Sequence, residues 1–69
     1  MSTNELRQAL VADDELSFSH NGRDYLLDGW NQCDGYVLSL ECDGELVWQS
    51  APMTKAACTE EFLRYYSEL

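Results

Sequence analysis

The chain has 69 residues, of which 13 are acidic and 4 are basic, so its formal net charge is −9. This length allows one domain at most, and the hydrophobic fraction of 45% is enough for one core. The excess of acidic residues argues against nucleic acid or an anionic membrane as a direct partner, because both attract Lys and Arg. It favours a partner protein with a basic surface.

A short N-terminal helix is predicted over residues 3–13. Ser2 followed by Glu5 has the form of a capping box, in which a hydroxyl precedes a Glu by three residues. Leu6, Ala9 and Leu10 then fall on one helical face.

A β-hairpin follows the helix. Residues 16–20 alternate apolar and polar side chains, and Asn21-Gly22 is a strong signal for a two-residue turn. This turn pairs Phe18 with Tyr25 and puts the large apolar side chains on one sheet face. The opposite face of the second strand carries Asp24, Leu26, Asp28 and Trp30.

A second hairpin is predicted after a polar link over residues 30–35, with strands at 36–41 and 46–49. We interpret Cys42-Asp43-Gly44 as a three-residue loop with a bulge at Gly44, which pairs Glu41 with Glu45 and places Leu46 in the core. A two-residue Asp43-Gly44 turn would pair Leu46 with Glu41 instead. The three-residue loop segregates the two faces better, so it is preferred.

The C-terminal helix is predicted over residues 55–68, with Thr54 as its N-cap. Its apolar residues recur at helical spacing: Cys58, Phe62, Tyr65, Tyr66 and Leu69. The sequence therefore predicts a single α+β domain over residues 1–69, with element order α-β-β-β-β-α. We expect a four-stranded antiparallel meander of two hairpins, with both helices packed on one face.

The uneven distribution of charge indicates a candidate binding surface. No basic residue occurs between Arg23 and Lys55, and carboxylates alternate with apolar side chains on the sheet face away from the predicted core. Such a surface is a candidate for partner binding, although an ordinary solvated sheet face is the alternative interpretation. The predicted partner-binding residues are Asp24, Leu26, Asp28, Trp30, Val37, Glu41, Asp43, Glu45 and Val47.

Catalytic and metal chemistry find little support in the sequence. His20, the only histidine, is expected to be an exposed residue beside the first hairpin turn. A zinc site would need His20 to converge with all three cysteines, which are expected in a loop (Cys33), a turn (Cys42) and the core (Cys58). Since no Gly-rich phosphate loop or calcium loop is present either, we expect no enzyme activity, no catalytic residue, no metal and no cofactor.

In size, acidity and α+β pattern the whole chain is similar to phage-encoded inhibitors of nucleic-acid enzymes, including anti-CRISPR proteins. This resemblance implies a stoichiometric inhibitor or regulator that mimics a nucleic acid and occupies a basic surface of its partner. Two alternatives stay open: an accessory or self-associating domain with a hydrophobic sheet face, and an antitoxin-like partner. A homodimer is possible, and the expected location is the cytoplasm of a bacterium or of an infected host cell.

Overall fold

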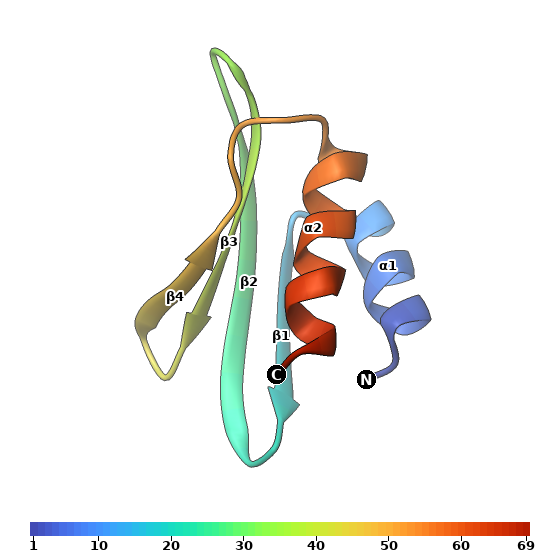
Figure 1. Cartoon of the computed structure of the whole chain (residues 1–69), viewed down its shortest axis with the longest axis vertical. Coiled ribbons are helices and arrows are strands. Elements are labelled where there is room, and N and C mark those ends of the chain that lie inside the picture. The colour runs from blue at the N-terminus through green and yellow to red at the C-terminus, as the bar shows by residue number, and fades with distance from the viewer.

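The chain folds into two layers, a twisted antiparallel sheet on one side and a pair of helices on the other (Figure 1). These features come from a computed structural model that describes all 69 residues. The elements are α1 (Thr3–Ala12), β1 (Glu15–His20), β2 (Arg23–Gln32), β3 (Gly35–Cys42), β4 (Glu45–Gln49) and α2 (Lys55–Ser67). The sheet order β1-β2-β3-β4 is the expected meander, and the predicted fold class is confirmed.

Both helices begin at the predicted caps. The Ser2 hydroxyl accepts a hydrogen bond from the Glu5 backbone N–H at 3.2 Å, and the Ser2 N–H donates to the Glu5 carboxylate at 2.9 Å. Thr54 Oγ1 accepts from the Ala57 N–H at 3.1 Å. These bonds satisfy N–H groups that have no partner within the helix, so they fix where each helix starts.

The first hairpin has the predicted register, with Leu16 opposite Leu27 and Phe18 opposite Tyr25. Asn21 and Gly22 both have positive φ, 52° and 78°, which is the geometry of a two-residue type I′ turn. The Phe18 and Tyr25 rings stack with their centroids 5.3 Å apart on the face that the helices cover.

The predicted link over residues 30–35 is wrong. β2 continues to Gln32 and β3 begins at Gly35, so that only Cys33 and Asp34 turn the chain. Backbone hydrogen bonding does not depend on side-chain polarity, so the polar residues Asn31 and Gln32 still pair with β3. The β2–β3 hairpin consequently extends beyond the helices, as Figure 1 shows at the top of the sheet.

The predicted register of the β3–β4 hairpin is also wrong. Asp43 and Gly44 both have positive φ, 51° and 88°, and form a two-residue turn that pairs Cys42 with Glu45 and Glu41 with Leu46. A bulge follows, and Trp48 pairs with Leu40. The extra residue of the bulge returns Trp48 to the core face, which is where the predicted three-residue loop would also place it. Leu46, expected in the core, is 59% exposed.

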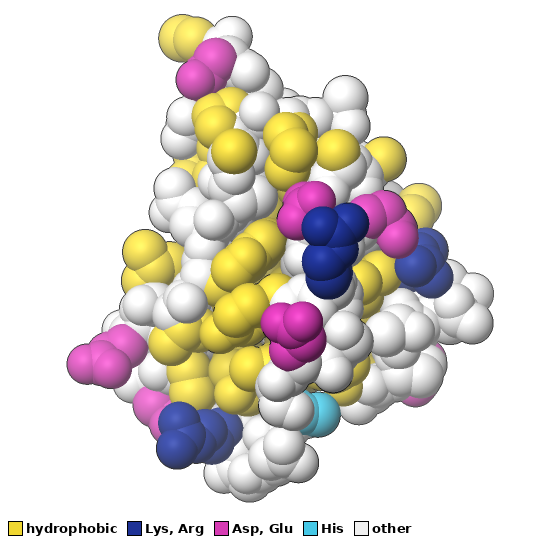
Figure 2. Space-filling model, in the orientation of Figure 1, with side chains coloured by type: hydrophobic (Ala, Val, Ile, Leu, Met, Phe, Trp, Pro, Cys, Tyr) yellow, Lys and Arg dark blue, Asp and Glu magenta, His cyan; other side chains and the backbone are white.

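The core lies between the sheet and the helices, where Figure 2 shows hydrophobic side chains between the two layers. Phe62 of α2 is fully buried at its centre, with ring centroids 6.3 Å from Phe18 and 5.8 Å from Trp48. α2 packs over β3 and against α1, and α1 also contacts β1. The opposite face of the sheet has no covering element.

Hydrogen bonds to Asp14 hold the connection between α1 and β1 against the sheet. The Tyr36 hydroxyl donates to Asp14 at 2.7 Å, and Lys55 Nζ contacts the same carboxylate at 3.0 Å. Burial, followed by the bond to Asp14, raises the pKa of Tyr36. The bonds from Tyr36 and Lys55 lower the pKa of Asp14. The Tyr36 ring covers Gly29, where an added Cβ would lie 1.9 Å from the Tyr36 hydroxyl oxygen.

Candidate partner-binding face

The uncovered face of the sheet, here called the outer face, carries one alternate set of side chains from each strand. Asp24, Leu26, Asp28 and Trp30 lie on it in β2, since Phe18, Tyr25 and Leu27 point toward the helices. The register then assigns Val37, Ser39 and Glu41 of β3 and Leu46 of β4 to the same face.

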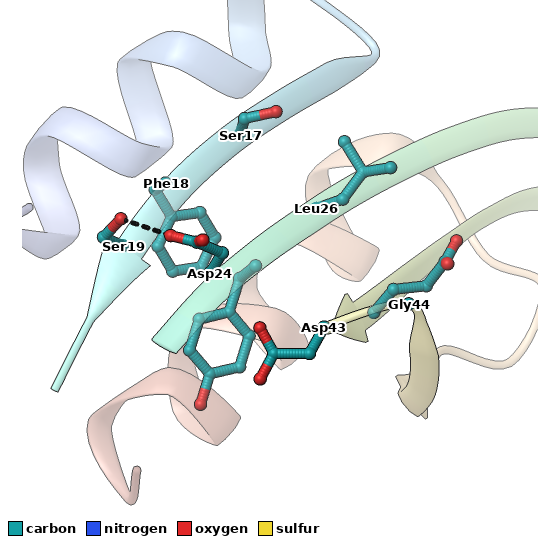
Figure 3. Close-up of a pocket in the computed structure, with 9 residues that line it drawn as sticks. Ser17, Phe18, Ser19, Asp24, Leu26, Asp43 and Gly44 are labelled. Carbon is teal, nitrogen blue, oxygen red and sulfur yellow. Dashed lines mark hydrogen bonds between the residues drawn. The ribbon is translucent and has the colours of Figure 1, made fainter. Parts of the chain in front are cut away.

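One end of the outer face is hollowed. A depression of about 410 Å³ lies where the β1–β2 hairpin meets the β3–β4 turn, and Figure 3 shows its lining. The carboxylates of Asp24, Glu41 and Asp43 and the hydroxyls of Ser17 and Ser19 border it together with Leu26. The hollow is thus rich in oxygen acceptors and has a small apolar floor. The full set of lining residues is Ser17, Phe18, Ser19, Asp24, Tyr25, Leu26, Glu41, Asp43 and Gly44.

Backbone pairing brings these carboxylates together. The Asp43 N–H donates to the Asp24 carbonyl at 3.1 Å, which continues the β2–β3 ladder into the turn. Leu26 pairs with Glu41, so Glu41 lies one step along the same face. Asp43 itself lies in the turn, with φ of 51°, and its carboxylate accepts from the Cys42 thiol at 3.8 Å. Asp24, Glu41 and Asp43 therefore border one hollow, where their like charges repel one another.

Hydrogen bonding orients one carboxylate of the hollow. Ser19 Oγ donates to Asp24 Oδ1 at 2.9 Å, shown as the dashed line in Figure 3. Both residues are exposed, so the remaining acceptor positions of Asp24 face solvent.

Ion pairs occur only away from the sheet. The three pairs are Arg7–Glu60 at 2.9 Å, Lys55–Asp14 at 3.0 Å and Arg64–Glu61 at 3.3 Å, and none includes a strand residue. Figure 2 shows Lys and Arg side chains against acidic side chains over the helical layer. Arg7 lowers the pKa of Glu60 through their hydrogen bonds. None of the carboxylates of the outer face takes part in an ion pair.

The structure separates the predicted site residues into groups. Asp24, Leu26, Glu41 and Asp43 come together in the hollow, whereas Asp28 and Trp30 lie farther along the outer face and are half-buried. Val37, expected as an exposed anchor, is only 1% exposed. It is opposite Trp30, and the Tyr36–Met53 bridge holds the following chain beside it, so little of its surface reaches solvent.

One predicted residue of the last hairpin, Glu45, lies on a different face of the sheet than expected, and another, Val47, lies at the bulge. Glu45 pairs with the core residue Cys42, so it belongs to the helix-facing side of the sheet, at an exposed margin. Val47 is 42% exposed, at the bulge. The two-residue turn explains the position of Glu45, because it shifts the side chains between the turn and the bulge to the opposite face.

Sequence reasoning did not select Ser17 and Ser19 as site residues, although the alternation in β1 places both on the outer face. It also missed the proximity of Asp24 and Asp43. A hydroxyl at each alternate position of an edge strand was the available signal for the serines. The Asp pair depends on the turn geometry, which no local pattern decided.

The side chains considered for catalysis and metal binding are dispersed. No group of three or more His, Cys, Asp and Glu side chains is placed to hold a metal ion. His20 is half-buried rather than exposed, because its ring packs 4.9 Å from that of Tyr66. Cys42, expected in a turn, is a buried residue at the end of β3. Cys58 is fully buried, as predicted, and donates to the Tyr36 carbonyl at 3.1 Å.

A second depression of about 360 Å³ lies between the two helices, bordered by Arg7, Leu10, Val11, Lys55 and Glu60 among others. Both of its basic side chains are already in ion pairs, with Glu60 and Asp14. Its charge is therefore internally balanced, unlike that of the hollow.

No helix of the structure is both long and apolar enough to cross a membrane. Comparison with models of protein families, with curated proteins and with solved structures gives no match for this chain. The geometry and charge of the outer face are therefore the observations from which a function can be argued.

Proposed function

We propose that this protein is a non-catalytic binding module that uses its acidic outer face to engage a basic surface of a partner protein. In its most specific form it is a stoichiometric inhibitor that mimics a nucleic acid and occupies the partner's nucleic-acid-binding surface. A phage-encoded protein directed against a nucleic-acid-dependent defence, of the anti-CRISPR kind, would have this role.

The observation that carries the proposal is the segregation of charge. Every ion pair lies on the helical layer or on the connection from α1 to β1, while Asp24, Glu41 and Asp43 border the hollow, whose lining includes no Lys or Arg. A chain with only four basic residues has used three of them away from the sheet. Carboxylates held close together without compensation destabilise the free protein, and a cationic partner relieves that cost on binding.

The hollow also offers geometry that a cationic side chain can use. Carboxylate and hydroxyl oxygens surround a half-buried Leu26, so a guanidinium or ammonium group would find acceptors around it and its aliphatic stem an apolar floor. Arg and Lys side chains are the groups with which nucleic-acid-binding proteins contact phosphates. A surface that attracts them competes with nucleic acid for the same groove.

The test is to immobilise the protein, capture partners from host lysate and elute them with rising salt. We expect a captured protein that itself binds nucleic acid, and we expect this chain to displace that nucleic acid at one equivalent. The affinity should fall steeply with salt, because charges are screened over about 8 Å at physiological ionic strength. An affinity that does not change between low and high salt would overturn the proposal that the protein mimics a nucleic acid.

Two double variants of equal charge test whether location matters. Asp24→Lys with Glu41→Lys reverses two carboxylates of the hollow, and Asp13→Lys with Glu68→Lys reverses two exposed carboxylates next to the helices. We expect the first to abolish binding and the second to weaken it only modestly. Equal losses would show that net charge alone, and not this face, governs the interaction.

A second candidate function is an accessory or self-associating domain that docks through apolar side chains. The observation that favours it is the exposure of Leu46 at 59% and Val47 at 42% beside half-buried Trp30 and Leu26. Trp30→Ala would then do more damage to binding than the hollow variant, since aromatic anchors carry much of the energy of apolar interfaces. High salt would leave such an interface intact.

A further inference from the structure

The free edge of β4 is the least covered element of the fold. The sheet order leaves β1 and β4 as edges, α1 contacts β1, and neither helix comes close to the backbone of β4. Figure 1 shows β4 at the edge of the sheet that is farther from both helices. β4 also exposes Leu46 and Val47, whereas the exposed positions of β1 are Glu15 and two serines.

Backbone geometry identifies the groups that this edge presents. Ser50 N–H donates to the Leu38 carbonyl at 2.8 Å, so Leu38 and Ser50 form a hydrogen-bonded pair. Hydrogen-bonded and non-hydrogen-bonded pairs alternate in antiparallel sheets, and the preceding pair, Ser39 with Gln49, is therefore non-hydrogen-bonded. The N–H and C=O groups of Gln49 point away from β3. The same alternation, counted from the two-residue turn, turns those of Leu46 outward.

The charge around this edge determines what kind of strand fits it. Glu41, Asp43 and Glu45 surround the β3–β4 turn, and no Lys or Arg occurs from Asp24 to Thr54. A second copy of the chain would bring another net charge of −9 to the same edge. An extended segment with Lys or Arg side chains instead gains both backbone hydrogen bonds and attraction to these carboxylates.

We propose that the edge of β4 binds an extended basic segment of the partner protein by strand addition, which lengthens the sheet to five strands. This inference rests on the proposed function, because it assumes the same basic partner. It adds the mode of recognition: backbone bonds to Leu46 and Gln49 give affinity, and the carboxylates near the turn select Lys and Arg.

The test uses the full chain labelled with nitrogen-15 and a synthetic peptide in which lysine alternates with threonine. A matched peptide has glutamate in place of lysine. We expect the lysine peptide to shift the amide resonances of β4 and to slow hydrogen exchange at Leu46 and Gln49. The glutamate peptide should do neither. Absence of binding, equal binding of both peptides, or shifts confined to the hollow would each overturn the inference.

Backbone variants separate edge pairing from side-chain effects. Gln49→Pro removes the outward N–H and blocks the edge without removing a bond to β3, and Gln49→Ala changes the side chain alone. We expect Gln49→Pro to weaken binding of the lysine peptide about tenfold or more, and Gln49→Ala to bind it like the wild type. Ser17→Pro, which blocks the β1 edge, should also bind like the wild type. Near-ultraviolet circular dichroism verifies that each variant is folded. Leu46→Ala keeps its backbone N–H, so it should still bind the lysine peptide if the backbone of the edge provides the affinity.

The inference and the proposed function fail in different experiments. If Gln49→Pro binds as well as Gln49→Ala, strand addition is wrong, while loss of binding in the Asp24→Lys, Glu41→Lys variant still supports the acidic face. If sedimentation shows that the chain dimerises and that Gln49→Pro abolishes the dimer, the occupant of the edge is a second copy and the inference is overturned.

Discussion

At the scale of single residues, Asp43 belongs both to the β3–β4 turn and to the border of the hollow. It occupies a left-handed position of the β3–β4 turn with φ of 51°, and its backbone N–H bonds to Asp24. Asn tolerates such a position as well as Asp does, and Asn-Gly is a favoured sequence for this turn. A carboxylate here, at the border of a hollow with two other carboxylates, is therefore not what the turn itself requires.

We accordingly expect Asp43→Asn to raise the free energy of unfolding by about 0.5 kcal/mol, because it reduces the repulsion among the carboxylates that border the hollow. The same variant should bind the partner more weakly. Urea denaturation followed by Trp fluorescence measures the first effect. Asp34→Asn is the matched control in the β2–β3 turn, and an equal gain in that variant would contradict the role assigned to the carboxylates of the hollow.

Asp14 gives a prediction about pH. Hydrogen bonds from Tyr36 and Lys55 hold its pKa below the ordinary value of 3.8, so its contribution to stability is present above that value and is lost as pH falls through the folded pKa. Asp14→Asn should be less stable than the wild type at neutral pH, and this difference should shrink in acid. Denaturation series across the acid range provide the measurement. Asp13→Asn, whose carboxyl makes no side-chain hydrogen bond, is the control.

At the scale of elements, the bulge in β4 decides which side chains are buried. Glu41 pairs with Leu46 and Leu40 with Trp48, so one residue of β4 has no partner in β3. The bulge exposes Leu46 and Val47 while the Trp48 ring packs against Phe62 and Tyr65 at 5.8 Å. Bulges of this kind also increase the local twist of the strand that carries them.

Deletion of Val47 should therefore give a regular ladder that still carries Trp48 opposite Leu40. We expect the variant to fold with the Trp48 fluorescence of the wild type and to lose less than about 1.5 kcal/mol of stability, since no core side chain is removed. Its flatter edge should increase self-association in sedimentation. Deletion of Gln49 retains the bulge but moves Ser50 away from Leu38, so it should destabilise the fold more.

At the scale of the whole molecule, the charge of −9 opposes compaction. Three ion pairs compensate only a minority of the acidic residues, and the remaining carboxylates lie mostly at the surface. Repulsion among these carboxylates destabilises the free protein, so its stability should rise with ionic strength. Its affinity for a basic partner should fall with ionic strength.

Added NaCl should raise the midpoint of thermal unfolding. At about 1 M salt the screening length falls to about 3 Å, which removes most of the repulsion between surface carboxylates. A gain of about 1 kcal/mol would appear as a rise of about 4–8 °C in a domain of this size. The Asp24→Lys, Glu41→Lys variant should gain less from salt. A midpoint that is unchanged by salt would contradict the role of self-repulsion.

The sequence alone determined the two helices and their caps, the presence of four strands, the first hairpin register and the antiparallel meander, but not where β2 ends and β3 begins. Each of these follows from local signals: hydrogen bonding by Ser2 and Thr54, apolar spacing in α2, and the φ preferences of Asn21-Gly22. The sequence also located the base-free acidic stretch and placed Asp24, Leu26 and Glu41 on one face.

Only the tertiary structure decided the register of the last hairpin and hence the composition of the outer face. A three-residue loop and a two-residue turn with a later bulge both return Trp48 to the core, so side-chain patterning could not choose between them. Packing of Trp48 on α2 and pairing of Asp43 with Asp24 are contacts between distant segments. They accompany the register that exposes Leu46, because tertiary contacts fix the register where the local signals are equal.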